Sequence, residues 1–308
     1  MASASPPPGF SAVQRQFSAL VQTLSRDGER SRSADERRLL VDQIRAALDR
    51  GEARLSQEPE TVVANTFVLE ERIHAGTSTE VHRARHRDLG TYHAIKTLTA
   101  QQAGDPVASR LLLHEAAIGL ALRHPHIVAT QALLRLADGR PALVFEWSGR
   151  SLAEHLRKGP ISLADIHAVM AALLSALSGL HDAGWVHCDI SPGNLLIDED
   201  RAGQARLADF GVAVATGLRQ SDLDLSFAGQ PEFAAPEQIA SEPLDGRSDL
   251  YAAGRLLSVL LDRCDQHSHG CSAISTLRLL ATTLSHQRPE MRPENAKAAQ
   301  ALLGGFRV

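Results

Sequence analysis

The segment Trp185–Gly211, WVHCDISPGNLLIDEDRAGQARLADFG, places the strongest constraint on what this chain can fold into. It contains two polar loops flanked by apolar, strand-like residues, a pattern that predicts a β-hairpin returning the second loop to the first. The first loop contains Asp189 and Asn194, and the second contains Asp209. A hairpin would hold these two carboxylates and one amide at the same edge of a cleft. Such oxygen ligands suit Mg²⁺ bound together with substrate phosphates, and a carboxylate there can orient a hydroxyl nucleophile.

Three motifs in this half of the chain resemble the signature elements of eukaryotic-type (Hanks-type) serine/threonine protein kinases, which are H-R-D-L-x-x-x-N, D-F-G and A-P-E. They stand in the family's order as His187-Cys188-Asp189-Ile190 with Asn194, then Asp209-Phe210-Gly211, then Ala235-Pro236-Glu237. Each motif alone is weak, but the three in order support one another. The resemblance covers about Asn65–Leu303. It implies an α+β, two-lobed fold with ATP between a five-stranded antiparallel sheet carrying one helix and a mainly helical lobe.

The resemblance also implies roles for individual residues. Lys96 corresponds to the lysine that binds the α- and β-phosphates of ATP, and Glu115 on a predicted helix is its expected ion-pair partner. Asp209 and Asn194 correspond to the Mg²⁺ ligands, with Mn²⁺ as an alternative ion, and Asp189 to the residue that accepts or orients the hydroxyl proton. The implied catalytic residues are Asp189, Lys96, Asn194 and Ser191. The implied nucleotide contacts are Ile73, Gly76, Val81, Ala94, Lys96, Glu115, Phe145, Glu146, Trp147, Ser148, Leu196 and Asp209.

The chain departs from the family pattern beside the expected phosphates. Only the central glycine of the phosphate-covering loop G-x-G-x-x-G-x-V is present, as Gly76, while His74 and Thr79 replace the outer two. Ser191 replaces the lysine that reaches the transferring phosphate, and Gln230 replaces a threonine that is expected to touch it. Loss of that positive charge is expected to slow the reaction by about 10²-fold or more, which would leave slower chemistry in place.

A few residues outside the cleft are expected to support the catalytic loop. Cys188 replaces the arginine that commonly receives an activation-loop phosphate, which predicts weaker dependence on such phosphorylation. Asp249 resembles an acid at a helix start that braces the backbone of the catalytic loop. Glu237 and Arg292 resemble a carboxylate–arginine pair that fastens the C-terminal helices to the activation segment.

Bulk properties limit the class of protein. The 308 residues are 44% hydrophobic, which is enough for a sizeable core, and the net charge of −4 gives no reason to expect nucleic acid as a partner. No apolar run is expected to reach the roughly 18 residues that span a bilayer, and the N-terminus lacks the basic-then-apolar order of a signal peptide. The three cysteines fit a reducing compartment. We therefore expect a cytoplasmic protein with no membrane segment, and the Ala, Leu and Arg bias suggests a bacterial source.

The N-terminal part is organised differently from the remainder. Residues 1–9 are Pro-rich and are predicted to be disordered. Residues 10–51 show helical periodicity in two segments, which predicts a helical hairpin. Residues 52–64 are predicted to be a linker, and the kinase-like domain is expected over 65–308. The hairpin is interpreted either as a brace for that domain or as a site for homodimerisation or for a regulatory partner.

The resemblance implies an ATP-dependent kinase that transfers a phosphoryl group to Ser or Thr of a protein. One alternative is a nucleotide-binding pseudokinase that acts as a scaffold or allosteric regulator, because the phosphate-side positions are altered. Another is a small-molecule kinase related to aminoglycoside phosphotransferases, although the A-P-E motif and Asp249 argue against it. The group Cys264, His267, His269 and Cys271 is interpreted as a polar loop, with a zinc site as the alternative.

Overall fold

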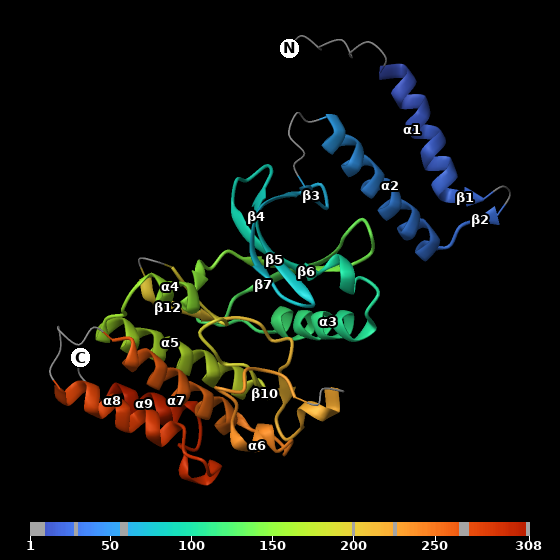
Figure 1. Cartoon of the computed structure of the whole chain (residues 1–308). Coiled ribbons are helices and arrows are strands. Elements are labelled where there is room, and N and C mark those ends of the chain that lie inside the picture. Colours follow the sequence, from blue (N-terminus) through green and yellow to red (C-terminus); the bar gives the residue numbers. More distant parts are fainter. Residues whose placement is uncertain are drawn as a thin grey trace.

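The computed structural model has two lobes and a helical hairpin at the N-terminal side (Figure 1). It describes residues 10–27, 30–55, 61–198, 201–223, 227–264 and 271–305. The predicted disorder of residues 1–9 falls outside these ranges, as do His267 and His269 of the Cys264–Cys271 group, so the polar-loop and zinc interpretations stay untested; Cys264 itself is buried. The α+β, two-lobed prediction is confirmed.

An antiparallel sheet forms the N lobe. In the described residues its strands are β3 (Thr61–Val63), β4 (Phe67–Ala75), β5 (Thr79–His86), β6 (Tyr92–Leu98), β7 (Thr130–Arg135) and β8 (Pro141–Glu146). Their order across the sheet is β3-β4-β5-β6-β8-β7. In the centre, Lys96 of β6 is paired with Val81 of β5 and with Leu143 of β8. The register therefore places the lysine in the middle of the sheet.

Strand β3 is a sixth strand beyond the five that the sequence predicted, and it lies within the segment that was expected to be a linker. Its three residues pair with Phe67–Leu69 of β4, and Val63 is buried against the sheet. A three-residue strand is too short to show the alternation that marks a strand in sequence. Strand β3 extends the sheet at its edge and leaves the five predicted strands in place.

Helix α3 (Pro106–Ala121) packs against the sheet and carries Glu115. It begins where the Asp105 side chain accepts hydrogen bonds from the backbone N–H groups of Val107 and Ala108, with a proline as the first helical residue. Leu112 is buried on the same face as Glu115. Burial of this face fixes the rotation of the helix, so that its single buried acid points into the protein.

The C lobe is mainly helical. Its helices are α4 (Leu152–Lys158), α5 (Leu163–Asp182), α6 (Pro236–Ile239), α7 (Gly246–Asp262), α8 (Cys271–Leu284) and α9 (Ala296–Gly304), with 3₁₀ turns at Gln220–Leu223 and Pro289–Met291; one more lies in the N lobe, at Ala100–Gln102. Helix α5 is central and contacts α7, α9 and β12 (Arg201–Leu207). It is capped by Ser162, whose side chain accepts a hydrogen bond from the N–H of Asp165.

Helix α5 is also long and apolar enough to cross a membrane, with 20 residues and a mean hydropathy of 1.7. The prediction that no apolar run is long enough to span a membrane was therefore wrong for this helix. In the fold, 56% of its most apolar window is buried inside the protein. Because the central helix of a globular lobe needs the same composition, the burial of α5 accounts for its apolar character.

The catalytic hairpin predicted from Trp185–Gly211 is present. Strands β11 (Leu195–Asp198) and β12 pair antiparallel, and Leu195 lies opposite Leu207. The short strand β9 (Arg150–Ser151) adds to β11, and β10 (Trp185–Val186) pairs with β13 (Val214–Ala215). The second pairing ties the chain just before the first polar loop to the chain just after the second, so the two loops lie side by side.

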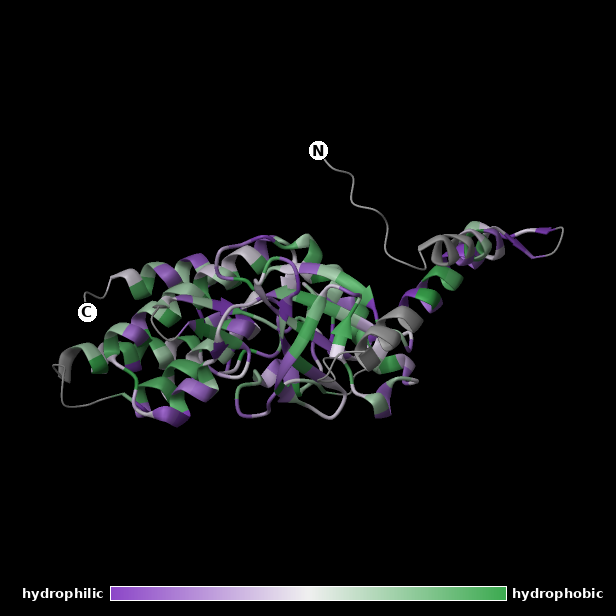
Figure 2. Ribbon diagram, turned by 90° about the horizontal axis from the view of Figure 1, so that it is seen from above, coloured by the Kyte–Doolittle hydropathy of each residue, from purple (hydrophilic) through white to green (hydrophobic). Residues whose placement is uncertain are grey.

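At the N-terminal side, α1 (Phe10–Ser25) and α2 (Ala34–Leu55) are joined through a two-stranded ribbon, β1 (Arg26–Asp27) and β2 (Arg30–Ser31). Helix α2 continues four residues beyond the predicted end of the hairpin at Gly51 and contacts β3. Figure 2 shows the hairpin extending away from the two-lobed body. Most of its surface is therefore not covered by the lobes.

The expected Glu237–Arg292 pair is formed in the core of the C lobe. Arg292 Nη1 donates to Glu237 Oε1 at 2.6 Å and Nη2 donates to Oε2 at 2.9 Å. The remaining guanidinium N–H groups donate to the carbonyls of His286, Arg247 and Gln287. The arginine side chain is 0% exposed, so every donor is used and none faces water.

We expect Arg292→Ala to lower the free energy of unfolding by about 3–5 kcal/mol, because it leaves the Glu237 carboxylate buried without its partner. Urea unfolding measures this change. Arg278→Ala is the matched control, since Arg278 pairs with Asp262 on the surface at 3.0 Å and the two side chains are 50% and 66% exposed. That variant should lose less than about 1 kcal/mol, and equal losses would contradict the structural role assigned to Arg292.

Candidate active site

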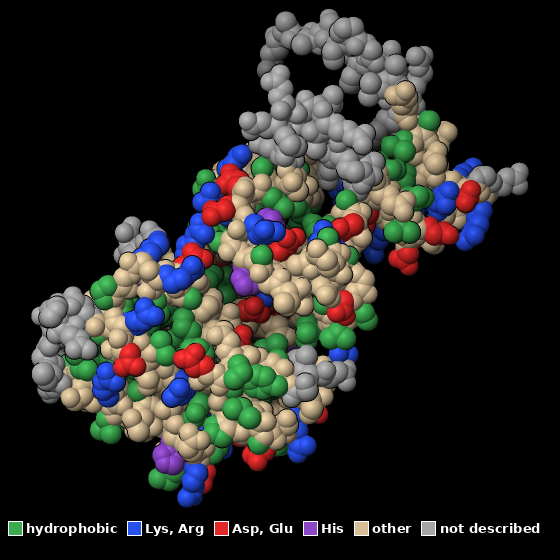
Figure 3. Space-filling model, in the orientation of Figure 1, with side chains coloured by type: hydrophobic (Ala, Val, Ile, Leu, Met, Phe, Trp, Pro, Cys, Tyr) green, Lys and Arg blue, Asp and Glu red, His purple; other side chains and the backbone are tan. Residues whose placement is uncertain are grey.

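The candidate site lies in the hollow between the lobes, where acidic side chains are visible in the space-filling view (Figure 3). The N lobe supplies Lys96 from β6 and Glu115 from α3, and the C lobe supplies the two polar loops around Asp189 and Asp209. These residues are far apart in the sequence and meet because the catalytic hairpin faces the sheet.

Lys96 joins three segments. Its Nζ lies 2.8 Å from Glu115 Oε2 and 2.9 Å from Asp209 Oδ1. Lys96 is 7% exposed and Glu115 is 2% exposed, whereas the Asp209 side chain is 43% exposed. The predicted Lys96–Glu115 pair is therefore formed, and Asp209 is the member of the trio that faces the open cleft.

The three charges shift each other's pKa values. Burial is the largest influence on Glu115 and raises its pKa, and the nearby Lys96 ammonium only partly opposes this. Burial also acts to raise the pKa of Asp209, but the charge and hydrogen bond of Lys96 hold it below its ordinary value. For Lys96, the two carboxylates outweigh burial and raise its pKa. The lysine and Asp209 are thus charged at neutral pH.

Asp189 and Asn194 form a second polar group on the first loop. Asn194 Nδ2 donates to the backbone oxygen of Asp189 at 2.8 Å and to its Oδ2 at 2.7 Å. Asp189 Oδ1 is buried and has no hydrogen-bond partner. Burial, the largest influence, and the charge of Asp209 raise the pKa of Asp189. A buried carboxylate oxygen without a partner is available to a hydroxyl group placed there by a substrate.

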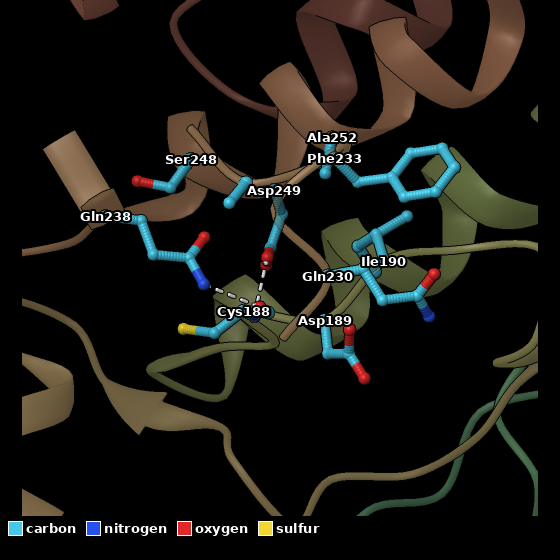
Figure 4. Close-up of a pocket in the computed structure, with 10 residues that line it drawn as sticks. Cys188, Asp189, Ile190, Gln230, Phe233, Gln238, Ser248, Asp249 and Ala252 are labelled. Carbon is cyan, nitrogen blue, oxygen red and sulfur yellow. Dashed lines mark hydrogen bonds between the residues drawn. The ribbon is translucent and has the colours of Figure 1, made fainter. Parts of the chain in front are cut away.

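Asp249 holds the backbone of the first loop, as predicted. Its carboxylate accepts hydrogen bonds from the N–H groups of His187 at 2.8 Å and Cys188 at 3.0 Å, and from His181 Nε2 at 2.8 Å. Cys188 has a φ of 67°, a left-handed backbone conformation that is costly for any residue other than glycine. Figure 4 shows Asp249 and Gln238 reaching Cys188, while Asp189 points away from them. The anchor thus directs Asp189 toward the cleft.

The two replaced positions, Ser191 and Gln230, touch each other as expected. Gln230 Nε2 donates to Ser191 Oγ at 2.8 Å. Ser191 is 0% exposed, whereas Gln230 is exposed. The neighbouring Gly229 has a φ of 109°, and a Cβ there would lie 2.7 Å from the carbonyl oxygen of Cys188. Only glycine therefore lets this segment pass so close to the first loop.

An apolar cluster lines the inner end of the cleft. Ala94 of β6 and Leu196 of β11 pack from opposite lobes against a buried group that includes Phe145. Apolar side chains contributed by both lobes suit contact with a flat aromatic ring. The following residues, Glu146, Trp147 and Ser148, connect the lobes in the position predicted for the hinge.

Two ion pairs cross between the lobes beside this connection. Glu146 Oε1 lies 2.7 Å from Arg206 Nη1 on β12. Glu71 of β4 accepts from Arg150 Nη2 at 2.9 and 3.0 Å. The sequence did not reveal these pairs, because no motif marks them and their members are 60 and 79 positions apart in the chain.

The phosphate-covering loop is formed between β4 and β5. The N–H of Gly76 donates to the Thr79 carbonyl at 2.8 Å, which closes a tight turn. The His74 ring packs over this turn, with Nε2 3.1 Å from where a Cβ on Gly76 would lie. Ile73 and Val81 are half-buried at the base of the loop. The turn persists without the outer two glycines, and an imidazole covers it.

The donor atoms fit a divalent cation that is bound together with phosphates. Asn194 uses Nδ2 to hold Asp189, which leaves its Oδ1 as the free amide oxygen, and Asp209 has an exposed carboxylate. Within the described ranges no cluster of three or more His, Cys, Asp and Glu could hold a metal by itself. A site with few protein oxygens that needs substrate phosphates to complete its shell is typical of Mg²⁺.

Several contacts that the sequence analysis missed hold helix α3 and the activation segment in place. His114 Nε2 donates to the Ala213 carbonyl at 2.7 Å, and Arg110 donates to the Leu223 carbonyl at 3.1 Å. Gln220 donates to the Ala228 carbonyl at 2.8 Å, and Gln238 donates to the carbonyl of Cys188 at 2.8 Å. All these acceptors are backbone carbonyls, so no side-chain pattern in the sequence identifies the partners.

Comparisons with known proteins agree with this geometry. The family model described as protein kinase domain matches residues 67–302. A probable serine/threonine-protein kinase of Streptomyces coelicolor is 37% identical over 193 residues, which are 60% of this chain and 28% of that protein. The probable serine/threonine-protein kinase PknB of Bifidobacterium longum is 31% identical over 215 residues, which are 66% of this chain and 31% of that protein. The chain thus spans about a third or less of these relatives.

A solved structure gives the same fold. The crystal structure of the PknI kinase domain of Mycobacterium tuberculosis superposes with a TM-score of 0.60 at 20% identity, and covers 81% of this chain and 99% of that domain. The family match extends over both lobes and over every element that supplies the site. This chain therefore belongs to the protein kinase family, as its three ordered motifs and its two-lobed fold indicate.

Proposed function

We propose that this chain is an ATP-dependent serine/threonine protein kinase. The observation that carries the proposal is the Lys96 trio, in which one buried ammonium joins Glu115 to the cleft-facing Asp209. Asp189 and Asn194 lie beside it on the first loop, joined by their own hydrogen bonds. The names of the relatives support Ser and Thr as the phosphorylated residues.

In the proposed reaction, the acceptor hydroxyl oxygen forms a bond to the γ-phosphorus while the bond from that phosphorus to the β,γ-bridging oxygen breaks. The bonding electron pair leaves with ADP, and the hydroxyl proton passes to Asp189. Lys96, held by Glu115, binds phosphate oxygens, while the apolar pair Ala94 and Leu196 holds the base. Positioning and charge neutralisation supply most of the acceleration.

We infer that Asp209 and Asn194 hold the divalent cation, with Mg²⁺ favoured by their oxygen atoms. When bound, this ion neutralises charge on the phosphates. Asp209 remains ionised for that role because Lys96 keeps its pKa low. Asn194 keeps its oxygen available because its amide nitrogen is occupied by Asp189.

We expect Asp189→Asn to reduce transfer of ³²P from ATP to a generic protein substrate by about 10³-fold, because the variant cannot accept the proton. Its thermal midpoint with Mg·ATP should still rise as in the wild type, because binding stabilises the folded state. Asp182→Asn, an exposed aspartate at the end of α5, is the control and should keep full activity. Equal labelling by Asp189→Asn and wild type would remove Asp189 from the mechanism.

The pseudokinase alternative is favoured by His74 over the phosphate turn and by the absence of the lysine at position 191. The same experiments separate it from the kinase. A wild-type protein that is stabilised by Mg·ATP, but that phosphorylates neither itself nor any substrate by mass measurement, would be a nucleotide-binding scaffold.

The raised pKa values predict a pH dependence. Both Glu115 and Asp189 must be ionised, the first to hold Lys96 and the second to accept a proton. Activity should therefore fall as pH decreases through pKa values above the ordinary 4.5 and 3.8 of these two groups. The pH profile of kcat/KM for ATP reports these ionisations in the free enzyme. Glu115→Gln should make the decline less steep, and a wild-type decline centred at the ordinary values would contradict the assignment.

We further propose that residues 10–51 dock a protein partner, with a second copy of this chain as the first candidate. Val21, Leu39 and Val41 of the helical hairpin are 44%, 62% and 38% exposed. Light scattering of the full chain should show a mass that falls with dilution, and Leu39→Glu should lower it at fixed concentration. A mass that stays that of a monomer at every concentration would exclude self-association, and the hairpin would then be expected to bind a different protein. The cytoplasmic location also stays a proposal, supported by the buried thiol of Cys188.

A further inference from the structure

The side chain at position 191 lies behind the surface of the cleft. Ser191 is 0% exposed, and its Oγ accepts a hydrogen bond from Gln230 Nε2 at 2.8 Å. A buried hydroxyl in this position cannot extend to a phosphoryl group in the open cleft. The structure therefore leaves the site without a donor from position 191, and the nearest candidate is the residue that bonds to it.

Gln230 is exposed and lies beside the catalytic loop. Figure 4 shows its side chain next to Asp189, on the side of the loop away from Asp249 and Gln238. Gln230 and Asp189 line the same pocket, which places the two residues close together. A primary amide carries two N–H donors, so the bond to Ser191 occupies one and leaves the second for a ligand.

The segment around Gln230 is held against the loop on both sides. A Cβ on Gly229 would lie 2.7 Å from the Cys188 carbonyl oxygen and 3.5 Å from Asp189 Oδ1. Gln238 Nε2 donates to the carbonyls of Cys188 at 2.8 Å and Ala228 at 3.0 Å. The amide of Gln230 is thus fixed at its backbone by the close passage and at its tip by Ser191.

We propose that Gln230 is a catalytic residue that donates its free amide N–H to the transferring phosphoryl group, and that Ser191 is the positioning residue that orients this amide. The proposal rests on the kinase function proposed above. In the family pattern, the donor to this phosphoryl group is a charged lysine on the catalytic loop. In this chain the proposed donor is instead a neutral amide on the activation segment.

The chemistry limits where the phosphoryl group lies. A hydroxyl that is hydrogen-bonded to Asp189 attacks a phosphorus atom about 3–3.5 Å from its oxygen. A donor adjacent to Asp189 is therefore within reach of the equatorial phosphoryl oxygens. As the new O–P bond forms and the bond to the ADP oxygen breaks, negative charge is spread over these oxygens, and a fixed N–H donor stabilises that charge more than the ground state.

The test uses Gln230→Met in the full chain, because methionine keeps the length and volume of the side chain and removes both donors. We expect kcat for phosphorylation of a generic protein substrate to fall on the order of 10²-fold, with KM for ATP within about twofold of wild type. Ser191→Ala should lower kcat by about tenfold, because one positioning hydrogen bond is lost. The double variant should match Gln230→Met within about twofold, because Ser191 acts only through the amide.

Gln220→Met is the matched control, since it removes the hydrogen bonds to Ala228 and loosens the same segment while leaving the Gln230 amide in place. It should lower the thermal midpoint and change kcat by no more than a few-fold. A kcat for Gln230→Met equal to wild type, or an equal loss in Gln220→Met, would overturn the role of Gln230. Independent losses that multiply in the double variant would overturn the role of Ser191. A wild-type protein that binds Mg·ATP but shows no kinase activity would instead contradict the proposed kinase function.

Discussion

The buried charge of Lys96 is the constraint on which the cleft depends. An ammonium at 7% exposure is costly without partners, and the two carboxylates that satisfy it come from helix α3 and from the loop after β12. Three segments must therefore be in place together before the charge is satisfied. The same ion group thus links the two lobes, the buried face of α3 and Asp209, whose backbone is left-handed with a φ of 69°.

Much of this arrangement could be predicted from the sequence, because side chains with strong chemical requirements carried it. The family resemblance implied the Lys96–Glu115 pair, which a lysine in a central strand also requires, and it implied the Glu237–Arg292 pair as well. The contact between Ser191 and Gln230 followed from the replacement of two groups expected to touch. In each case both interacting groups were side chains, so the residue types and the order of the family motifs identified the two partners.

What the sequence did not show has a common physical cause. The ties from His114, Gln220 and Gln238 end on backbone carbonyls, which every residue has, so no residue type marks the acceptor. Strand β3 has three residues, too few to display a period. The burial of Ser191 and the close approach of Gly229 to the loop are both set by the tertiary fold, and neither has a signal in the sequence.

The two ion pairs beside the hinge have a kinetic consequence. Glu146–Arg206 and Glu71–Arg150 join the lobes beside the hinge, and their side chains are 29–44% exposed, so dissolved ions reach and screen them. Release of ADP from the proposed active site would require the lobes to separate there, and in many enzymes product release sets the turnover rate. Ionic strength would then act on this protein as a control of how long ADP stays bound, independently of the bond-making step deeper in the cleft.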